Sequence, residues 1–175
     1  MQCKKALEEA KGDMEKAVIV LLKKSGETAA KKEGRELGAG VIEAYIHNTK
    51  NVGAIVEVNC ETDFVANNEE FKKLAYDIAM HITASNPEYI KKEDINEEAM
   101  AKVREVLLPE VAGKPKDMKE KILAGKLDSY FSERLLMEQP FVKNPEVTIK
   151  NLVDQAIQKF GEKIMVSRFT RYSVK

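Results

Sequence analysis

The residues that could do chemistry gather in one short stretch, NCETDFVANNEEF, at positions 59–71. Two acids, Glu61 and Asp63, stand beside the aromatic ring of Phe64, between a strand-like segment and a strongly patterned helix. Aromatic rings at loop tips serve as anchors in protein interfaces. An acid beside such a ring would lie inside the partner, where its electric field acts at close range. The functional interpretation is therefore a protein-binding loop.

A structural interpretation of the same loop stands beside the functional one. Asp63 would make a local hydrogen bond within the turn. Phe64 or Val65 would pack on the following helix as a hydrophobic staple. The residue types alone leave both interpretations open.

Other chemistry in the chain is poorly supported by spacing. Cys60 with His47 or His81 could form a nucleophile and a base, but a free cysteine more often packs as a small apolar residue. A zinc site from Cys3, Cys60 and both histidines would lack the close ligand spacing that such sites have. The glycines fit no phosphate-binding loop. We therefore expect no catalytic group, no metal and no cofactor.

Composition sets broad limits on the class of protein. The 175 residues carry no formal net charge, 43% are apolar and 33% are charged. This length suits one domain with a small appendage, and the apolar content suits a packed core. A neutral chain is a poor binder of nucleic acid backbone. The sequence has no run that could span a bilayer and no visible leader, so we expect a cytoplasmic protein with free thiols.

The N-terminal part reads as a small helical unit over residues 1–26. Asp13 can cap a helix there, and Gly26 suits the position just after its end. Two short helices rarely bury enough surface to stand alone, so the unit looks incomplete at its N-terminal side. Residues 27–40 read as a polar linker that loosens toward Gly38 and Gly40.

Residues 41–175 read as the core domain. Two strands, 41–47 and 54–58, form a hairpin, and 163–174 is a third strand. On the first strand Ile42, Ala44 and Ile46 share one face. A helix capped by Asn67 or Asn68 and ended near 85–87 carries one apolar face, made by Phe71, Leu74, Ala75, Ile78, Ala79 and Ile82. Three strands with packed helices predict an α+β fold with a three-stranded antiparallel sheet.

Between the helix and the last strand, residues 96–139 read as a helical insertion. Asn96 caps its first helix, and Gly125 is expected to end a later one. A further helix over 147–160 is closed by Gly161. We find no internal repeat of the 41–82 module.

At the 59–71 loop the sequence resembles a known family. The segments CKKALEEAKGDMEKAVIVLLKKSG, GVIEAYIHNTKNVGAIVEVNCETDFVANNEEF, GKPKDMKEKILAGKLDSYFSERLLMEQPFVK and IMVSRFTRY are similar, in order, to bacterial translation elongation factor Ts. TDFVANN after a strand is one specific signature, and LLMEQPFVK is a second. The resemblance covers nearly the whole chain.

The resemblance implies a guanine-nucleotide exchange factor that binds elongation factor Tu with GDP and promotes GDP release during translation elongation. In the family the TDFV tetrapeptide, here Thr62, Asp63, Phe64 and Val65, displaces Mg²⁺. Phe64 would wedge between side chains of the partner's GTPase domain, and Asp63 would disturb the groups that hold the magnesium waters. The ring would then be exposed because its pocket belongs to another protein.

The resemblance also implies wider contacts. In the family an N-terminal helical domain of the ubiquitin-associated type grips the GTPase domain, which makes Lys4, Met14, Asn67 and Asn68 candidates for further partner contacts. This chain starts inside that domain, without the family's first helix, so we expect weaker binding than in a full-length relative. A single hairpin module resembles the short form of the family and implies a homodimer through the three-stranded sheet and nearby helices.

The implied activity breaks no covalent bond, so the chain is not expected to be an enzyme. The main alternative is a non-catalytic binding or scaffold module that keeps the fold without exchange activity. The two differ in whether Phe64 matters. A third hypothesis, a small thiol enzyme, requires a reactive Cys60 with a low pKa.

Overall fold

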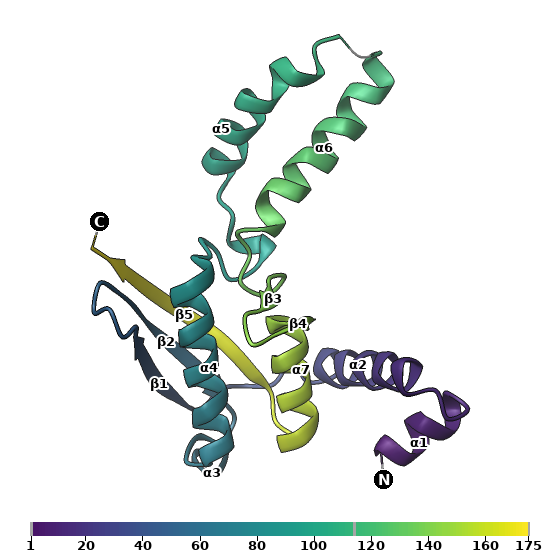
Figure 1. Cartoon of the computed structure of the whole chain (residues 1–175), viewed down its shortest axis with the longest axis vertical. Helices are drawn as coiled ribbons and strands as arrows, with labels where there is room; N and C mark the ends of the chain where they lie inside the picture. Colours follow the sequence, from purple (N-terminus) through teal and green to yellow (C-terminus); the bar gives the residue numbers. More distant parts are fainter. Residues whose placement is uncertain (1, 114, 175) are drawn as a thin grey trace.

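The computed structural model describes residues 2–113 and 115–174 as a sheet with helices packed on it and a long helical hairpin that leaves it (Figure 1). In chain order the elements are α1 (Gln2–Glu9), α2 (Met14–Ala30), β1 (Ala39–Ile46), β2 (Val52–Cys60), α3 (Asp63–Ala66), α4 (Glu69–Ser85), the 3-10 turn η1 (Lys92–Asp94), α5 (Glu97–Leu107), the 3-10 turn η2 (Leu108–Val111), α6 (Lys116–Ser132), β3 (Pro140–Phe141), β4 (Asn144–Thr148), α7 (Ile149–Phe160) and β5 (Ile164–Ser173).

The three long strands form an antiparallel sheet in the order β1-β2-β5. Ala39 pairs with Cys60 at one end of β1, and Cys60 pairs with Ile164 at the start of β5. The C-terminal end of β2 is therefore flanked by both neighbouring strands at the point where the candidate loop begins. The predicted α+β class and the three-stranded antiparallel sheet are confirmed.

The main core lies between one face of this sheet and α4 with α7. Val56 and Val58 point into it from β2, and both are fully buried. The α4 face predicted from helical spacing is buried there, with Leu74 only partly so. Phe71 of α4 meets Phe160 of α7 edge to face at 6.1 Å between ring centroids. The aromatic pair joins the two helices that cover the sheet.

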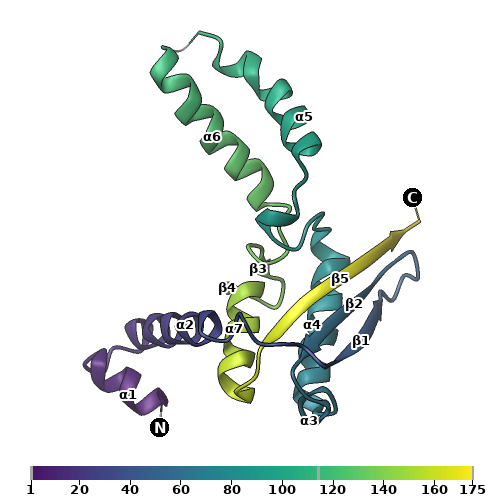
Figure 2. The ribbon, with the colours of Figure 1, turned by 180° about the vertical axis from the view of Figure 1, so that it is seen from behind.

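The opposite face of the sheet is open and carries apolar side chains. Seen from behind, β1, β2 and β5 have no helix in front of them (Figure 2). Ile42 and Ile46 lie on this face, as the alternation of β1 predicts, and Ile55 of the central strand lies between them and β5. An exposed apolar sheet face of this kind indicates an interaction surface.

The helix α2 continues through Gly26 to Ala30, so the expectation that Gly26 follows the helix end is wrong. Ser25 is buried, and its hydroxyl donates to Gln158 Oε1 of α7 at 2.5 Å. A Cβ on Gly26 would lie 3.6 Å from Asp154 Oδ2, also of α7. Packing on α7 therefore keeps this turn helical despite the low helix propensity of glycine. The polar stretch after the helix shortens to residues 31–38.

Helices α5 and α6 form a hairpin that projects away from the sheet (Figure 1). Gly125 lies inside α6 rather than at a helix end, which corrects the predicted break. A small cluster of Ile95, Phe131 and Leu135 closes the base of the hairpin. The short β3–β4 ribbon beside it was not predicted. No helix in the described part of the chain has the length and apolarity needed to cross a membrane.

The second sequence signature, LLMEQPFVK, has a structural role in this fold. Leu136 and Phe141 are buried, and the buried Gln139 places Oε1 2.9 Å from His81 Nε2. The backbone N–H of Val142 donates to His81 Nδ1 at 3.3 Å. These contacts suit a neutral imidazole, and burial lowers the pKa of His81. The signature therefore ties the end of the helical insertion to α4.

Candidate functional site

The candidate site is the loop of residues 61–68, which connects β2 to α4 and is called the 61–68 loop below. Thr62 has an extended backbone, with φ −131° and ψ 154°, and directly precedes the single helical turn α3. The N–H of Ala66 donates to the Thr62 carbonyl at 3.1 Å, and the N–H of Asn67 donates to the Asp63 carbonyl at 2.9 Å. The loop is therefore a short ordered turn.

The turn places neighbouring apolar side chains on opposite sides. Val65 and Ala66 are buried in the main core, whereas Phe64 is 84% exposed. The staple interpretation is therefore wrong for Phe64, because the buried position beside the core belongs to Val65. Leaving an aromatic ring in water gives up the free energy of its burial, about 1.5–3 kcal/mol. The exposed ring suits a role in binding another molecule.

The polar residues of the loop shape the turn. Asp63 takes part in the turn through its backbone carbonyl, which accepts a hydrogen bond from the side chain of Asn67 at 2.9 Å. The residue is exposed to solvent. Asn68 caps α4 by accepting from the N–H of Glu70 at 2.9 Å, as predicted. Asn67 is exposed and Asn68 is partly exposed, so both also present polar groups to solvent.

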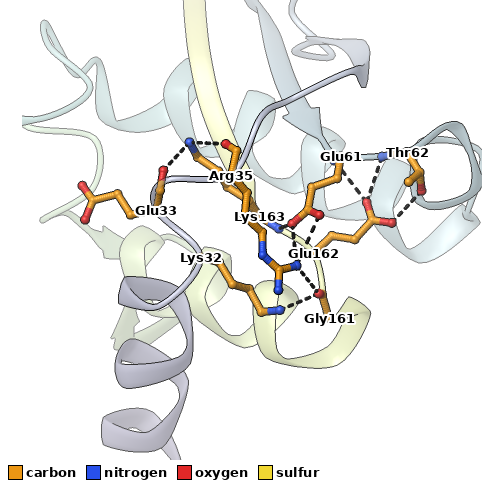
Figure 3. Close-up of polar contacts among 8 residues, drawn as sticks. All are labelled: Lys32, Glu33, Arg35, Glu61, Thr62, Gly161, Glu162 and Lys163. Carbon is orange, nitrogen blue, oxygen red and sulfur yellow. Dashed lines mark hydrogen bonds and ion pairs between the residues drawn. The ribbon is translucent and has the colours of Figure 1, made fainter.

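Two acids that flank the sheet hold the start of the loop (Figure 3). Glu162 Oε2 accepts from the N–H groups of Glu61 (3.1 Å) and Thr62 (3.0 Å), and Glu162 Oε1 accepts from the Thr62 hydroxyl (2.6 Å). The Glu61 carboxylate accepts from the N–H of Lys163 (2.5 Å) and from Arg35 (3.1 Å). The Lys163 N–H and the Arg35 guanidinium lower the pKa of Glu61.

Sequence reasoning missed Glu162, Lys163 and Arg35 as parts of this site. Each is distant in sequence, because Glu162 lies 100 residues after Thr62 and Arg35 lies 26 residues before Glu61. Lysine, arginine and glutamate are also common surface residues, so no local pattern marks these three. The pairing of β2 with β5 brings Glu162 and Lys163 to Glu61, and the pairing of β1 with β2 brings the segment of Arg35 there.

The thiol-enzyme hypothesis is wrong for Cys60. The side chain is fully buried, and burial, followed by the negative charge of Glu162, raises the pKa of its thiol. A raised pKa removes the thiolate that a nucleophile needs. Both cysteines are free, with Cys3 exposed on α1. Among the residues that the structure describes, no group of three or more His, Cys, Asp or Glu is placed to hold a metal ion.

Lys4 and Met14, the other predicted contacts, lie on the N-terminal helices. Lys4 is exposed on α1, and Met14 is 69% exposed at the start of α2, near the exposed Val18 and Ile19. Figure 1 places these helices well to the side of α3. The fold therefore does not bring Lys4 and Met14 together with the 61–68 loop into one small site.

The 61–68 loop is convex. A hollow of about 930 Å³ between α2, α7 and β5 is lined by residues such as Ala29, Ile157 and Val166, and it includes no residue of the loop. A small-molecule site is normally concave. The loop is not part of this hollow, and it presents the exposed Phe64 to solvent instead.

Comparison with known proteins identifies the family. The sequence model described as Elongation factor TS matches residues 2–175. The chain belongs to the elongation factor Ts family. A protein named Elongation factor Ts from Carboxydothermus hydrogenoformans is 50% identical over 176 residues, which cover 99% of this chain and 81% of that protein. Its namesakes from Moorella thermoacetica and Thermodesulfovibrio yellowstonii are 49% and 51% identical, over 99% of this chain and 87% of each relative.

Elongation factor Ts is a translation factor, so membership in this family assigns the chain to protein biosynthesis. The resemblance drawn from the TDFVANN and LLMEQPFVK signatures is thereby confirmed. The two signatures differ in their placement, because TDFVANN carries an exposed aromatic ring, whereas LLMEQPFVK buries its aromatic residue, Phe141, together with Leu135, Leu136 and Gln139.

Proposed function

We propose that this chain is a guanine-nucleotide exchange factor that binds elongation factor Tu with GDP, disturbs its Mg²⁺ and nucleotide site, and promotes GDP release. The observation that carries the proposal is the 84% exposure of Phe64 on a turn whose two ends are fixed, by Val65 in the core and by Thr62 on Glu162. A preorganised anchor loses little entropy on binding. Elongation factor Tu is the partner that the family implies, and the cytoplasm, where translation takes place, is the expected site of action.

The proposed mechanism assigns a role to each residue of the tetrapeptide. Phe64 enters a pocket of the GTPase domain and shifts its helices, while Asp63 acts on the groups that hold the magnesium waters. Mg²⁺ needs near-ideal octahedral oxygen ligands, so a small displacement of its shell weakens the nucleotide. Val65 and Thr62 hold the turn to the core and to Glu162, respectively, so that the two outward side chains keep their positions.

A single ring cannot supply the whole affinity. Its burial is worth about 1.5–3 kcal/mol, whereas a micromolar complex needs about 8 kcal/mol. We propose that α1 and α2, as a ubiquitin-associated-like N-terminal unit, add contacts through Lys4 and the exposed Met14. Asn67 and Asn68 extend the contact beside Phe64. The interface would then span both regions.

Linkage gives the test of this function. A protein that lowers the affinity of its partner for GDP must itself bind the GDP-loaded partner more weakly than the nucleotide-free partner. The two affinity ratios are equal. We expect this chain to bind nucleotide-free elongation factor Tu at least about tenfold more tightly than the GDP complex, within the usual range of such couplings. Titration calorimetry of the chain into both forms measures the two dissociation constants.

Equal affinity for the two forms of elongation factor Tu would contradict the exchange function and favour a scaffold module of the same fold. Such a module makes no distinction between nucleotide states, because it does not touch the nucleotide site. The exchange factor makes and breaks no covalent bond in this scheme, so it acts as a binding partner and not as an enzyme.

We also propose that two copies of the chain pair through the open face of the sheet. The largest exposed apolar side chains of that face include Ile42, which is 67% exposed, together with Ile46, Ile55 and Tyr172. Two sheets that stack face to face bury such side chains between layers about 10 Å apart. The charged pair Glu57 and Arg168 lies on the same face beside Ile42 and Ile55, so the stacked sheets would enclose it as an ion pair.

Replacing Ile55 with lysine is expected to convert the dimer to a monomer, because the charge would be buried at the centre of the stacked sheets. Light scattering at micromolar concentration measures the mass, which should be twice that of one chain for the native protein and equal to one chain for the variant. Val106→Lys, at a 72% exposed position on α5, is the matched control and should leave the dimer intact. A native chain that is monomeric at this concentration would contradict dimerisation.

A further inference from the structure

The start of the 61–68 loop is held by a carboxylate from the opposite end of the sequence. Glu162 follows α7 and precedes β5, and it accepts three hydrogen bonds, from the N–H of Glu61, the N–H of Thr62 and the Thr62 hydroxyl. Hydrogen bonds to an ionised acceptor are about twice as strong as those between neutral groups. One side chain therefore satisfies all three donors at the point where β2 becomes the loop.

The arrangement is reciprocal. The N–H of Glu61 donates to the carboxylate of Glu162, and the N–H of Lys163 donates to the carboxylate of Glu61. These bonds continue the pairing of β2 with β5 beyond Cys60 and Ile164, where the regular ladder ends. Two side chains thus replace backbone partners and extend the rigid part of the sheet up to the edge of α3 (Figure 3).

The segment of residues 32–35 is hydrogen-bonded to the residues on either side of Glu162. Lys32 donates to the Gly161 carbonyl at 2.6 Å, and Lys163 Nζ donates to the carbonyls of Glu33 (2.6 Å) and Arg35 (2.9 Å). The chain that follows α2 therefore packs on the same residues that hold the loop. The position of Glu162 is fixed from both sides by its neighbours.

The hydrogen bonds of Thr62 bear directly on the position of Phe64. Thr62 is the N-cap residue of α3, yet its side chain makes no capping bond and instead donates to Glu162. Since α3 is a single turn, its direction depends on how its two ends are held, by Thr62 on one side and by buried Val65 on the other. Phe64 lies between these two anchors.

We propose that Glu162 is a positioning residue for the 61–68 loop, whose carboxylate holds Thr62 and thereby sets the direction in which Phe64 projects. This inference rests on the proposed exchange function for its activity test, and on the geometry alone for its structural test. Without the carboxylate the turn samples several directions, and only a fraction of molecules present Phe64 in the competent one. The apparent affinity for the partner falls by that fraction.

The test compares the native chain with Glu162→Gln, which keeps the size of the side chain and removes its charge. Glu162→Asp keeps the charge and is the conservative variant. Asp77→Asn is the matched control, because it removes a carboxylate of α4 that lies outside the 61–68 loop and binds Lys73 (2.9 Å) and Lys143 (2.7 Å). Circular dichroism first verifies that each variant is folded at the assay temperature.

Two readouts report on the loop itself. Amide hydrogen exchange at Glu61 and Thr62 should become at least about tenfold faster in Glu162→Gln, since the ionised oxygen that accepts from both N–H groups is replaced by a neutral amide oxygen, which is a weaker acceptor. Chymotrypsin should also cleave faster after Phe64. The control should match the native chain in both. Unchanged amide exchange at these two positions would overturn the positioning role, whatever the activity of the chain.

The third readout is stimulated GDP release from elongation factor Tu as a function of factor concentration. For Glu162→Gln we expect the half-saturating concentration to rise about tenfold and the maximal rate to stay within about twofold, because the bound loop is forced into position. Glu162→Asp should recover part of the loss. If Glu162→Gln shows faster amide exchange but the same half-saturating concentration as the native chain, the proposal is overturned. If the native chain itself does not stimulate GDP release, the exchange function is refuted instead.

Discussion

Replacing Phe64 with alanine is expected to reduce the stimulation of GDP release about 10- to 100-fold at a fixed, subsaturating concentration of the chain. The variant loses the burial of one aromatic ring in the partner, worth about 1.5–3 kcal/mol, and each 1.4 kcal/mol is a factor of ten. It should keep the stability of the native chain, because the ring is 84% exposed and contributes little to the core. Stopped-flow release and urea unfolding measure the two properties.

Phe64→Leu and Val106→Ala make the comparison specific. Leucine keeps an apolar side chain of smaller size and should retain part of the stimulation. Val106 is 72% exposed on α5, away from the 61–68 loop, so its truncation should leave release unchanged. Full stimulation by Phe64→Ala would mean that the ring is not the anchor, and the role of the loop would need another explanation.

The opposite pattern is expected for Phe71→Ala, seven residues further along the chain and on the next helix, α4. Phe71 is fully buried and packs edge to face on Phe160. Truncation of a buried phenylalanine leaves a cavity and costs about 3–5 kcal/mol of unfolding free energy. A domain of this size has about 5–15 kcal/mol in total, so a large share of the stability is lost.

Urea denaturation followed by circular dichroism measures this loss, with Phe64→Ala as the control at an exposed aromatic position. At temperatures where Phe71→Ala is still folded, it should stimulate GDP release as the native chain does. A loss below about 1 kcal/mol would show that the space collapses around the missing ring, and that Phe71 is not central to the packing of α4 on α7.

The two phenylalanines also show what a sequence can and cannot predict. The burial of Phe71 follows from helical spacing, because Ile78 and Ile82 repeat on the same face and α4 carries a cap at Asn68. The exposure of Phe64 has no such periodic signal, since a single turn of four residues is too short to show one. The expected binding role of Phe64 rests on the family resemblance, and its exposed position is known only from the fold.

Glycine positions mark the limits of local rules. Gly161 ends α7 with a positive φ of 76°, as predicted, because glycine adopts this left-handed conformation without a steric penalty. Gly26 lies within α2, where contact with α7 outweighs its low helix propensity. Long-range packing decides between these outcomes, and the local sequence around each glycine does not reveal that packing.

The residues that hold the start of the 61–68 loop could not be predicted from the sequence for the same reason. Glu162 meets Glu61 because β5 returns to pair with β2, and Arg35 meets Glu61 because β1 pairs with β2 on the other side. The open apolar face of the sheet was partly foreseen, since Ile42 and Ile46 alternate in β1, but which face the helices cover is a property of the whole fold.

The most direct test of the exchange function is the timed release of fluorescent GDP from elongation factor Tu, chased with excess unlabelled GDP. The release is followed with no addition, with the native chain and with Phe64→Ala. We predict clear acceleration by the native chain and loss of most of it in the variant. Release at the unstimulated rate in the presence of the native chain would contradict the account and leave a binding module without exchange activity.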